Sequence, residues 1–358
     1  MQAALQSLAE QVRAASERRR ALCLRGGGSK DFYGGEPRGE RVDTRGYAGI
    51  VSYEPSELVV TARCGTPLAE LEAALGERGQ MLAFEPPHFS AAGTGAATLG
   101  GCVAAGLSGP RRASAGAVRD FVLGAKLLDG RGRVLAFGGE VMKNVAGYDV
   151  SRLLAGSLGT LGVILEVSLK VLPRPPAEAT LRFELPQDRA IESLNRWAGR
   201  PLPISASKWR DGELLVRLSG APSALRAACD KLGGERLDDP QGERVWRALR
   251  EHDEPFFAGD APLWRLAVPS HAAPIELPGE QLVEWGGGQR WLRSRADAAT
   301  VRRAAAGAGG HATLFRATDK SAGAFAPLPA VLLRLHGALK QAFDPAGVFN
   351  PGRMYPDF

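Results

Sequence analysis

The segment Arg25 to Lys30 reads Arg-Gly-Gly-Gly-Ser-Lys, a combination that can bind a phosphate group. Three consecutive glycines allow successive backbone amides to point into one concavity, Ser29 adds a hydrogen-bond donor, and Arg25 and Lys30 supply positive charge. The spacing differs from that of a Walker A loop, and no helical pattern follows directly as in a Rossmann fingerprint. Taken alone, the segment is explained equally well as a surface turn.

Glycine remains frequent well beyond this loop. Between Pro86 and Val163 the sequence holds 16 of the 45 glycines of the chain. Glycine costs backbone entropy and is used where φ must be positive or where a ligand lies against the main chain. Because the stretch also contains strand patterns, it indicates a cofactor bound along the backbone of a folded domain.

The elements that must position these glycines are visible in the apolar patterns. A helix over 2–19 and a strand over 21–24 lead into the first glycine loop, and prolines at 173, 175 and 176 mark a domain boundary. The other predicted elements of this half are a strand at 58–63, a helix that begins at 66–67 and stops at Gly79, a hairpin over 121–137, a short helix to Leu154 and a strand at 163–171.

The composition is that of a globular protein of two or three domains, with 358 residues, 44% hydrophobic and 23% charged. No stretch of about 20 apolar residues could cross a bilayer, and the net charge of +6 comes from scattered basic residues, which argues against nucleic-acid binding. The first 20 residues lack the apolar block of a signal peptide, so we expect a cytoplasmic protein. The four cysteines and five histidines are dispersed, which predicts no metal site and assigns any iron–sulfur cluster to another chain.

Six segments of roughly residues 1–176, taken in order, resemble the vanillyl-alcohol oxidase family, whose FAD-binding domain is also called the PCMH type. In that family the first glycine loop holds the FAD pyrophosphate, and the later glycine segments line the dinucleotide and the flavin ring. The matching segments are G-G-G-S at 26–29, T-L-G-G at 98–101, S-G-P-R at 108–111, G-x-x-x-D at 116–120, K-N-x-x-G-Y-D at 143–149 and G-S-x-G-T-L-G-V at 156–163.

Carried over residue by residue, the resemblance implies one set of FAD contacts. Several family members link FAD covalently through a histidine in the first loop, which here holds neither histidine nor cysteine, so we expect non-covalent FAD. Cys102 is interpreted as a small buried residue. The implied FAD contacts are Gly26, Gly27, Gly28, Ser29, Lys30, Thr98, Gly100, Gly101, Ser108, Gly109, Gly159, Gly162 and Val163.

Segments of the second half extend the resemblance to the FAD-binding E-type subunits of bacterial glycolate oxidases. The resemblance implies a heteromeric complex with a larger flavin subunit and an iron–sulfur subunit, associated with a membrane only peripherally through that complex. It implies oxidation of a small 2-hydroxy acid, glycolate or D-lactate, two substrates that differ by one methyl group. The matching segments lie at 245–252, 263–266, 284–291, 309–316 and 343–354.

The expected fold is α+β, with a PCMH-type FAD-binding domain at 1–176, a smaller cap domain at 177–340 and a C-terminal tail at 341–358 that packs back on the FAD domain. Residues 179–238 follow the order strand, helix, strand, strand, helix, strand, which is that of a ferredoxin-like unit. A similar but less regular succession follows between Leu263 and Arg316.

Oxidation of a 2-hydroxy acid requires a cation for the carboxylate and a group that takes the hydroxyl proton. Arginine forms a bidentate pair with a carboxylate, which makes Arg265, Arg290 and Arg316 candidates, and His311 is the candidate base. A structural role explains each of these residues as well, and Trp264, Trp285 and Trp291 are interpreted as packing residues.

Two other functions remain open at this point. The larger D-type subunits carry a clustered histidine and carboxylate site that has no counterpart here, so the chain could be a flavoprotein that only relays electrons or supports assembly. A stand-alone reductase of the UDP-N-acetylenolpyruvoylglucosamine type shares the FAD fold, but the cap pattern and the terminal F-N-P-G-R argue against it.

Overall fold

The computed structural model describes residues 2–89, 95–139, 149–356 and 358. The first half is built on a five-stranded antiparallel sheet in the order β3-β4-β8-β6-β7, and β1 and β2 form a separate parallel pair. Its strands are β1 (Leu22–Arg25), β2 (Glu40–Asp43), β3 (Ile50–Glu54), β4 (Val59–Arg63), β5 (Gln80–Met81), β6 (Val122–Leu128), β7 (Val134–Gly138), β8 (Val163–Lys170) and β9 (Leu172–Pro173).

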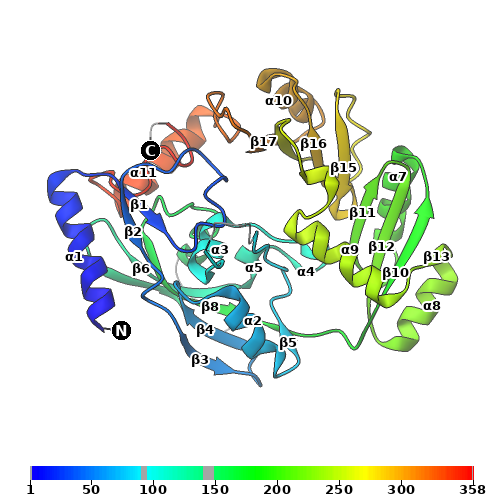
Figure 1. Ribbon diagram of the computed structural model, residues 1–358, viewed down its shortest axis with the longest axis horizontal. Coiled ribbons are helices and arrows are strands. Elements are labelled where there is room, and N and C mark those ends of the chain that lie inside the picture. Colours follow the sequence, from blue (N-terminus) through cyan, green and yellow to red (C-terminus); the bar gives the residue numbers. More distant parts are fainter. Residues whose placement is uncertain (1, 90–94, 140–148, 357) are drawn as a thin grey trace.

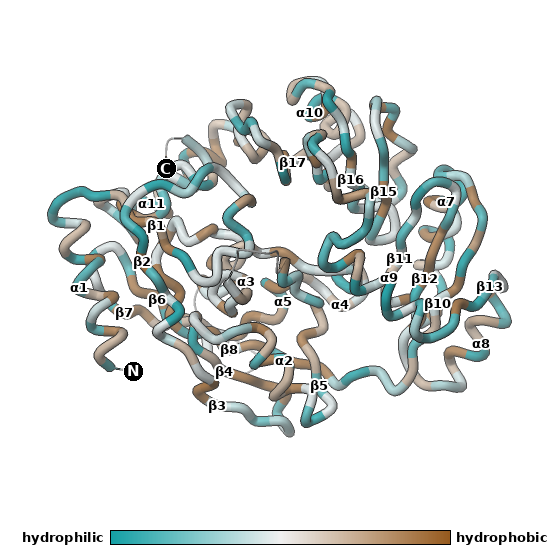
Figure 2. The backbone as a smooth tube through the Cα atoms, in the orientation of Figure 1, coloured by the Kyte–Doolittle hydropathy of each residue, from teal (hydrophilic) through white to brown (hydrophobic). Residues whose placement is uncertain are grey.

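Helices cover this sheet and close the first core. The helices are α1 (Gln2–Arg18), α2 (Leu68–Gly76), α3 (Leu99–Ala105), α4 (Arg112–Ala115), α5 (Val118–Phe121) and α6 (Val150–Leu153). The helix predicted to begin at 66–67 starts one residue later, with Pro67 as its N-cap. Strand β8 is buried along almost its whole length, and the hydropathy view shows apolar residues along the strands at the centre of this half (Figure 2).

The second half is an eight-stranded sheet with an internal repeat. The order β13-β10-β12-β11-β15-β16-β14-β17 contains the ferredoxin-like arrangement twice, joined where β11 pairs with β15. The predicted α+β fold is therefore confirmed (Figure 1). The elements are β10 (Ala177–Glu184), α7 (Gln187–Ala198), β11 (Ile204–Arg210), β12 (Glu213–Gly220), α8 (Pro222–Leu232), β13 (Glu235–Arg236), α9 (Asp239–Glu251), η1 (Pro255–Phe257), β14 (Leu263–Ala267), β15 (Glu280–Glu284), η2 (Trp285–Gly287), β16 (Gln289–Arg293), α10 (Ala298–Gly307) and β17 (His311–Arg316).

The two faces of the eight-stranded sheet have different partners. One face packs on α7, α8 and α10 through alternating apolar residues such as Leu181, Leu218 and Leu266. The other face packs on α9 and on residues of the first half, through a cluster that includes Trp291 and Phe315. The second face therefore looks toward the glycine-rich half.

The last helix and the tail return to the first half. Helix α11 (Ala330–Phe343), which the boundary at 340 divides, lies beside β1 and α1 in Figure 1. Its buried Lys340 donates to the carbonyls of Thr160 and Phe349, each at 2.8 Å, and pairs with Asp344 at 2.7 Å. Phe349 bridges to Leu22 of β1.

A shared carboxylate joins the two halves. Glu85 of the first half accepts from the Arg217 guanidinium of β12 at 2.9 Å and from the backbone amide of Arg111 at 2.8 Å. Arg111 in turn pairs with Glu178 of β10 at 2.5 Å. Burial alone would raise the pKa of Glu85, but Arg217 and Arg111 hold it below the ordinary value of 4.5.

Glu85→Gln should reduce the free energy of unfolding by about 3 kcal/mol at pH 7, because the two buried arginines lose their shared charge. Because the pKa of Glu85 is depressed in the folded state, this contribution is present above the unfolded pKa and is lost as pH falls through the folded pKa. Urea unfolding between pH 7 and pH 3 measures it. The exposed Glu57→Gln serves as the control. Equal stabilities of the two variants at pH 7 would contradict a stabilising role of the Glu85 carboxylate between Arg217 and Arg111.

Candidate functional site

The predicted glycine loop forms one wall of a cavity. Strand β1 ends at Arg25, and the loop that follows faces the N-terminal turn of α3, where Thr98 is the N-cap and accepts from the Gly101 amide at 3.3 Å. The tail closes the cavity from the other side. The lining includes Gly26, Gly27, Gly28, Ser29, Lys30, Thr98, Gly101, Asn350 and Arg353.

This cavity has the chemistry of an anion site. Within the described part of the chain, the amides of residues 26–29 donate to no acceptor. Lys30 is largely buried, with Nζ 3.3 Å from the Ser29 hydroxyl oxygen, and burial lowers its pKa against the raising effect of the Glu251 charge. Unpaired amides together with buried cations fit the pyrophosphate of a dinucleotide.

Glycine is required here by close approach of the main chain. A Cβ at Gly27 would overlap the carbonyl oxygen of Ala96, and Gly28 has a φ of +78°. Gly101 differs, because its Cβ would meet only the Thr98 hydroxyl oxygen at 3.2 Å and would otherwise point into open space. Position 101 therefore borders the cavity without being packed by protein.

A second, adjoining cavity continues the first. It is lined by Gly26, Gly100, Gly101, Gly159, Gly162, Val163 and Asn350. Asn350 connects its two sides, since its side-chain oxygen accepts from the Leu24 amide at 2.7 Å and its nitrogen donates to the Leu158 carbonyl at 2.6 Å. The sequence analysis assigned no role to Asn350, although the terminal F-N-P-G segment was a signal for it.

The remaining predicted FAD residues lie where the two halves meet. Ser108 and Gly109 line a narrow cavity together with His252, Arg265 and Trp291 of the cap. The Ser108 hydroxyl accepts from the Val118 amide at 3.0 Å. The chain of glycine segments thus runs from the first loop to the cap, as a cofactor that reaches from a phosphate site to a substrate site would require.

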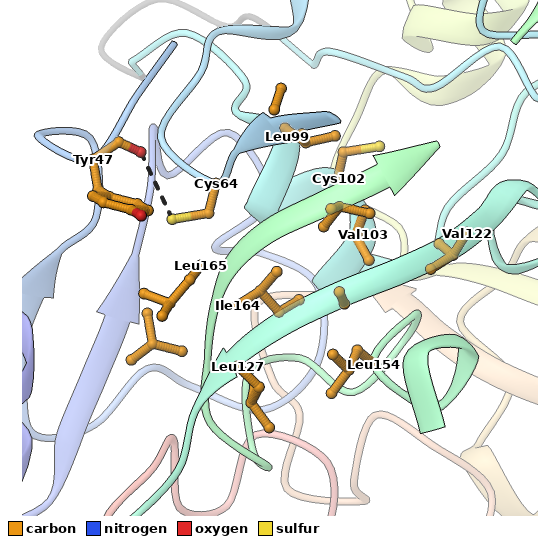
Figure 3. Packing of buried hydrophobic residues seen from close by; sticks show 14 of the residues in the cluster. Tyr47, Cys64, Leu99, Cys102, Val103, Val122, Leu127, Leu154, Ile164 and Leu165 are labelled. Atoms are coloured by element: carbon orange, nitrogen blue, oxygen red, sulfur yellow. Dashed lines mark hydrogen bonds between the residues drawn. The ribbon is translucent and has the colours of Figure 1, made fainter. Parts of the chain in front are cut away.

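Two further predictions concern residues near the glycine segments that line these cavities. The motif at 143–149 falls outside the described residues except for Asp149, which caps α6. Cys102 is buried beside Leu99 and Val103 in the first core (Figure 3), where burial raises the pKa of its thiol to about 12. A thiol with such a pKa stays protonated and unreactive.

Two of the predicted arginines meet at the junction. Arg265 points from β14 toward the first half, where it donates to the Tyr33 hydroxyl at 3.1 Å. Arg316 lies 4.4 Å from the centre of the Phe32 ring and 5.1 Å from that of Phe89. Burial lowers the pKa of Arg316 to about 10, so it remains charged at neutral pH.

A β-bulge explains how Arg316 reaches this place. In the β14–β17 pair, Trp264 faces Leu314 but Leu263 faces Arg316, so one extra residue, Phe315, is inserted. A bulge changes the direction of the side chains that follow it. Phe315 and Arg316 consequently both contact the aromatic cluster of the junction.

His252 is the residue that the sequence analysis missed. It follows the last residue of α9 in a left-handed conformation, φ 58°, and its ring stacks on Phe257 at 3.7 Å. Its Nδ1 atom is buried and has no hydrogen-bond partner among the described residues. Burial and the charges of Arg316 and Arg265 hold the pKa of His252 well below its ordinary value of 6.5, so the ring is neutral at pH 7.

The other two candidates lie elsewhere. Arg290 is on the opposite face of the sheet, because it alternates with Trp291, and its guanidinium donates to the carbonyls of Ala272, Ala273 and Gly287. His311 begins β17 and Arg316 ends it, so their backbones are about 16 Å apart along the strand. His311 lines a different cavity.

A buried carboxyl group completes the junction. Glu284 accepts from Trp291 Nε1 at 2.5 Å and from Gln289 Nε2 at 3.1 Å. Burial raises the pKa of Glu284 to about 7, against the lowering effect of these hydrogen bonds. The ring of Trp291 contacts that of His252 edge to face at 4.8 Å, so Glu284 fixes the wall against which His252 is packed.

Comparison with known proteins identifies the family. A family model described as an FAD binding domain matches residues 3–138. The glycolate oxidase subunit GlcE of Escherichia coli (strain K12) is 51% identical over 352 residues, which are 98% of this chain and 97% of the relative. The chain belongs to the GlcE family. FAD is its cofactor, and the chain is a subunit of an FAD-dependent oxidoreductase.

Other relatives match a smaller part of the chain. The glycolate oxidase subunit GlcD of Bacillus subtilis (strain 168) is 33% identical over 37% of this chain and 27% of the relative. A D-lactate dehydrogenase of Archaeoglobus fulgidus is 30% identical over 53% of this chain and 42% of the relative. A solved alkyldihydroxyacetonephosphate synthase, 15% identical, covers 97% of this chain and 75% of its own with a TM-score of 0.64, which shows a shared fold.

Among the described residues, no group of three or more histidine, cysteine or acidic side chains is arranged to bind a metal ion. No helix in the described ranges has the length and apolar character needed to span a membrane.

Gly101→Val should abolish FAD retention while the protein stays folded, because the added side chain occupies the cofactor cavity and meets almost no protein atoms. Gly27→Ala and bulkier residues at Gly28 should also lose FAD, but with a loss of stability, because they clash with the main chain or require a strained φ. Flavin absorbance per chain and thermal unfolding separate the two effects. Gly337→Ala, on an open face of α11, is the control; a folded Gly101→Val protein with full flavin content would overturn the assignment.

Proposed function

We propose that this chain is the FAD-binding subunit of a glycolate oxidase complex, in which it oxidises glycolate or D-lactate to the 2-oxo acid. The observation that carries the proposal is the buried His252, which lines one cavity with Arg265, Ser108 and Gly109 and whose pKa is lowered by burial and by the charges of Arg316 and Arg265. His252, Arg265 and Arg316 supply the required carboxylate clamp and proton acceptor. We also propose that FAD is bound without a covalent link, because the loop at 25–30 holds neither histidine nor cysteine and the Cys102 thiol is unreactive.

The two arginines suit a small carboxylate. Neither Arg265 nor Arg316 forms an ion pair among the described residues, and Arg316 stays charged at neutral pH because burial lowers its pKa only to about 10. A carboxylate bound between them would meet a site enclosed by Phe32, Phe89 and Phe315, where charge-assisted hydrogen bonds are stronger than in water. The aromatic walls leave the hydroxyl-bearing carbon as the part of the substrate that can face the cofactor.

His252 suits the removal of the hydroxyl proton. A base must be neutral before it accepts a proton, and burial together with the charges of Arg316 and Arg265 lowers the pKa of His252 and keeps the ring neutral in the free protein. A bound carboxylate offsets those charges, so the basicity of His252 increases when substrate is present. FAD, when bound, accepts the two electrons released from the substrate carbon.

His252→Gln should lower kcat about 100-fold or more in the assembled complex, the usual effect of losing a general base, while FAD content is unchanged. In the wild type, kcat/KM should hold as pH falls to 6.5 and decline only below it, as His252 takes a proton. Steady-state glycolate oxidation across pH measures both. The exposed His271→Gln is the control, and a His252→Gln complex with normal turnover would remove His252 from the site.

Arg316→Ala should lower kcat/KM for glycolate about 10- to 100-fold, since one charge-assisted contact to the carboxylate is lost. Arg316→Lys should restore part of the lost kcat/KM, because lysine returns the positive charge but cannot form the bidentate contact. Arg303→Ala, an exposed arginine of α10, is the matched control. Normal turnover of Arg316→Ala in a normally assembled complex would contradict the clamp.

We further propose that the complex contains a larger flavin subunit and an iron–sulfur subunit that receives the electrons. What supports a partner is α11, whose first turns expose Val331, Leu332, Leu333 and Leu335 to solvent, from 38% to 57% of each residue. Grouped exposed apolar side chains of this kind mark interaction surfaces. The other end of the same helix contacts the FAD-binding half, where Lys340 donates to the Thr160 carbonyl.

The double substitution Leu332→Ser and Leu335→Ser should reduce co-purification with the partner subunits at least tenfold, because it removes the apolar centre of that surface. Flavin content and thermal stability should not change, since both side chains are exposed. Val134→Ser on β7, where Val134 is 47% exposed, is the matched control. Retention of a full complex by the double variant would show that α11 does not bind the partners.

A further inference from the structure

A large cavity lies in the cap, apart from the site described above. It has a volume of about 770 Å³ and is bordered by α7, by the ends of β11, β14 and β17, and by α4 of the first half. The repeat explains its origin, because α7 covers the first ferredoxin-like unit whereas residues 268–279, at the equivalent place in the second unit, form no helix. Ile275 and Leu277 of this segment pack on the sheet, and the cavity lies beside its first residues, Val268, Pro269 and Ser270.

The charges at this cavity are unbalanced. Its described lining contains Arg112, Arg200 and His311 but neither aspartate nor glutamate. Arg112 forms no ion pair and no side-chain hydrogen bond in the described part of the chain, and its guanidinium carbon lies 4.5 Å above the centre of the Trp285 ring. Burial lowers the pKa of Arg112, as expected for a half-buried cation that lacks a counter-ion.

The walls around these cations are largely apolar. Leu194, Trp197, Leu202, Ile204 and Val268 line the cavity, and Trp197 is only 8% exposed. The polar groups on the α7 side satisfy each other, since Asn195 donates to the Ser270 carbonyl at 3.1 Å and accepts from the Ser270 hydroxyl at 2.7 Å. The group that would neutralise the cavity is therefore an anion bound to Arg112, and the apolar walls favour a ligand whose remaining part is apolar.

We propose that this cavity is a binding site for an amphipathic organic anion, with the acidic group at Arg112 and the apolar body against Trp197 and Trp285. The volume is that of sites for drug-sized ligands and far exceeds a two-carbon hydroxy acid, which separates it from the substrate site. The inference does not depend on the proposed reaction.

The cavity is connected to the flavin-lining residues by a direct contact. Trp285, which lines the cavity, donates from Nε1 to the Gly109 carbonyl at 3.2 Å, and Gly109 belongs to the predicted FAD contacts. Arg265 also acts on both places, since its charge lowers the pKa of His311 and of Arg112 on one side and of His252 on the other. An occupant of the cavity thus lies beside the end of the cofactor site.

Fluorescence titration of the FAD-loaded protein with anilinonaphthalene sulfonate tests the proposal. We expect one probe per chain, at least a tenfold weaker Kd in Arg112→Gln, and no binding in Ala113→Trp, where an exposed alanine of the lining is replaced by a side chain that fills the cavity. Arg226→Gln, at an exposed arginine of α8 that does not line the cavity, should bind as the wild type does. Unchanged flavin content and thermal stability show that each variant is folded.

A neutral analogue, phenylnaphthylamine, separates the two parts of the proposal. It should bind at least tenfold more weakly than the sulfonate, because it cannot neutralise Arg112. Equal binding of the two probes would overturn the anion assignment. Wild-type binding of the sulfonate in Arg112→Gln and Ala113→Trp would place the probe on another surface, such as the exposed end of α11, and would overturn the site itself.

Discussion

The position of the cap over the cofactor half is the constraint on which the rest of the structure depends. The predicted FAD contacts belong to the first half, whereas Arg265, Arg316 and His252 belong to the cap, so the proposed site is complete only when the two halves are joined. Glu85 fixes the junction by sharing its carboxylate between Arg217 and Arg111. Glu251 of α9 adds a second connection by accepting from the amides of His88 and Phe89, at 3.0 and 2.8 Å. Buried charges that lose their partner are strongly destabilising, which makes this joint stiff.

Sequence alone predicted the features that depend on local chemistry. The glycine loop, the hairpin of β6 and β7 and the repeated strand order of the cap follow from residue periodicity and turn residues. Alternation along a strand also distinguishes Arg265 from Arg290, because Trp264 and Trp291 lie on opposite faces of the sheet. That distinction was available from the sequence once the core side of each strand was known.

Other parts of the site could not be predicted because they depend on non-local packing. Arg316 reaches the junction only through the bulge at Phe315, which breaks the alternation that a pattern assumes. His252 looks like an ordinary helix-terminal residue until α9 is docked against Phe89 and Trp291. His311, the histidine nearest to the predicted arginines in sequence, lies at the wrong end of its strand for a substrate held by Arg316.

The most direct test is anaerobic reduction of the flavin that this chain binds. The absorbance of the complete complex is recorded before and after glycolate is added, for the wild type and for a complex whose Gly101→Val chain has lost its FAD, and the difference isolates this flavin. We expect the flavin band isolated in this way to bleach with excess glycolate. A band that stays oxidised while glycolate is consumed would contradict the proposed function, because the chain would then bind FAD without taking part in turnover.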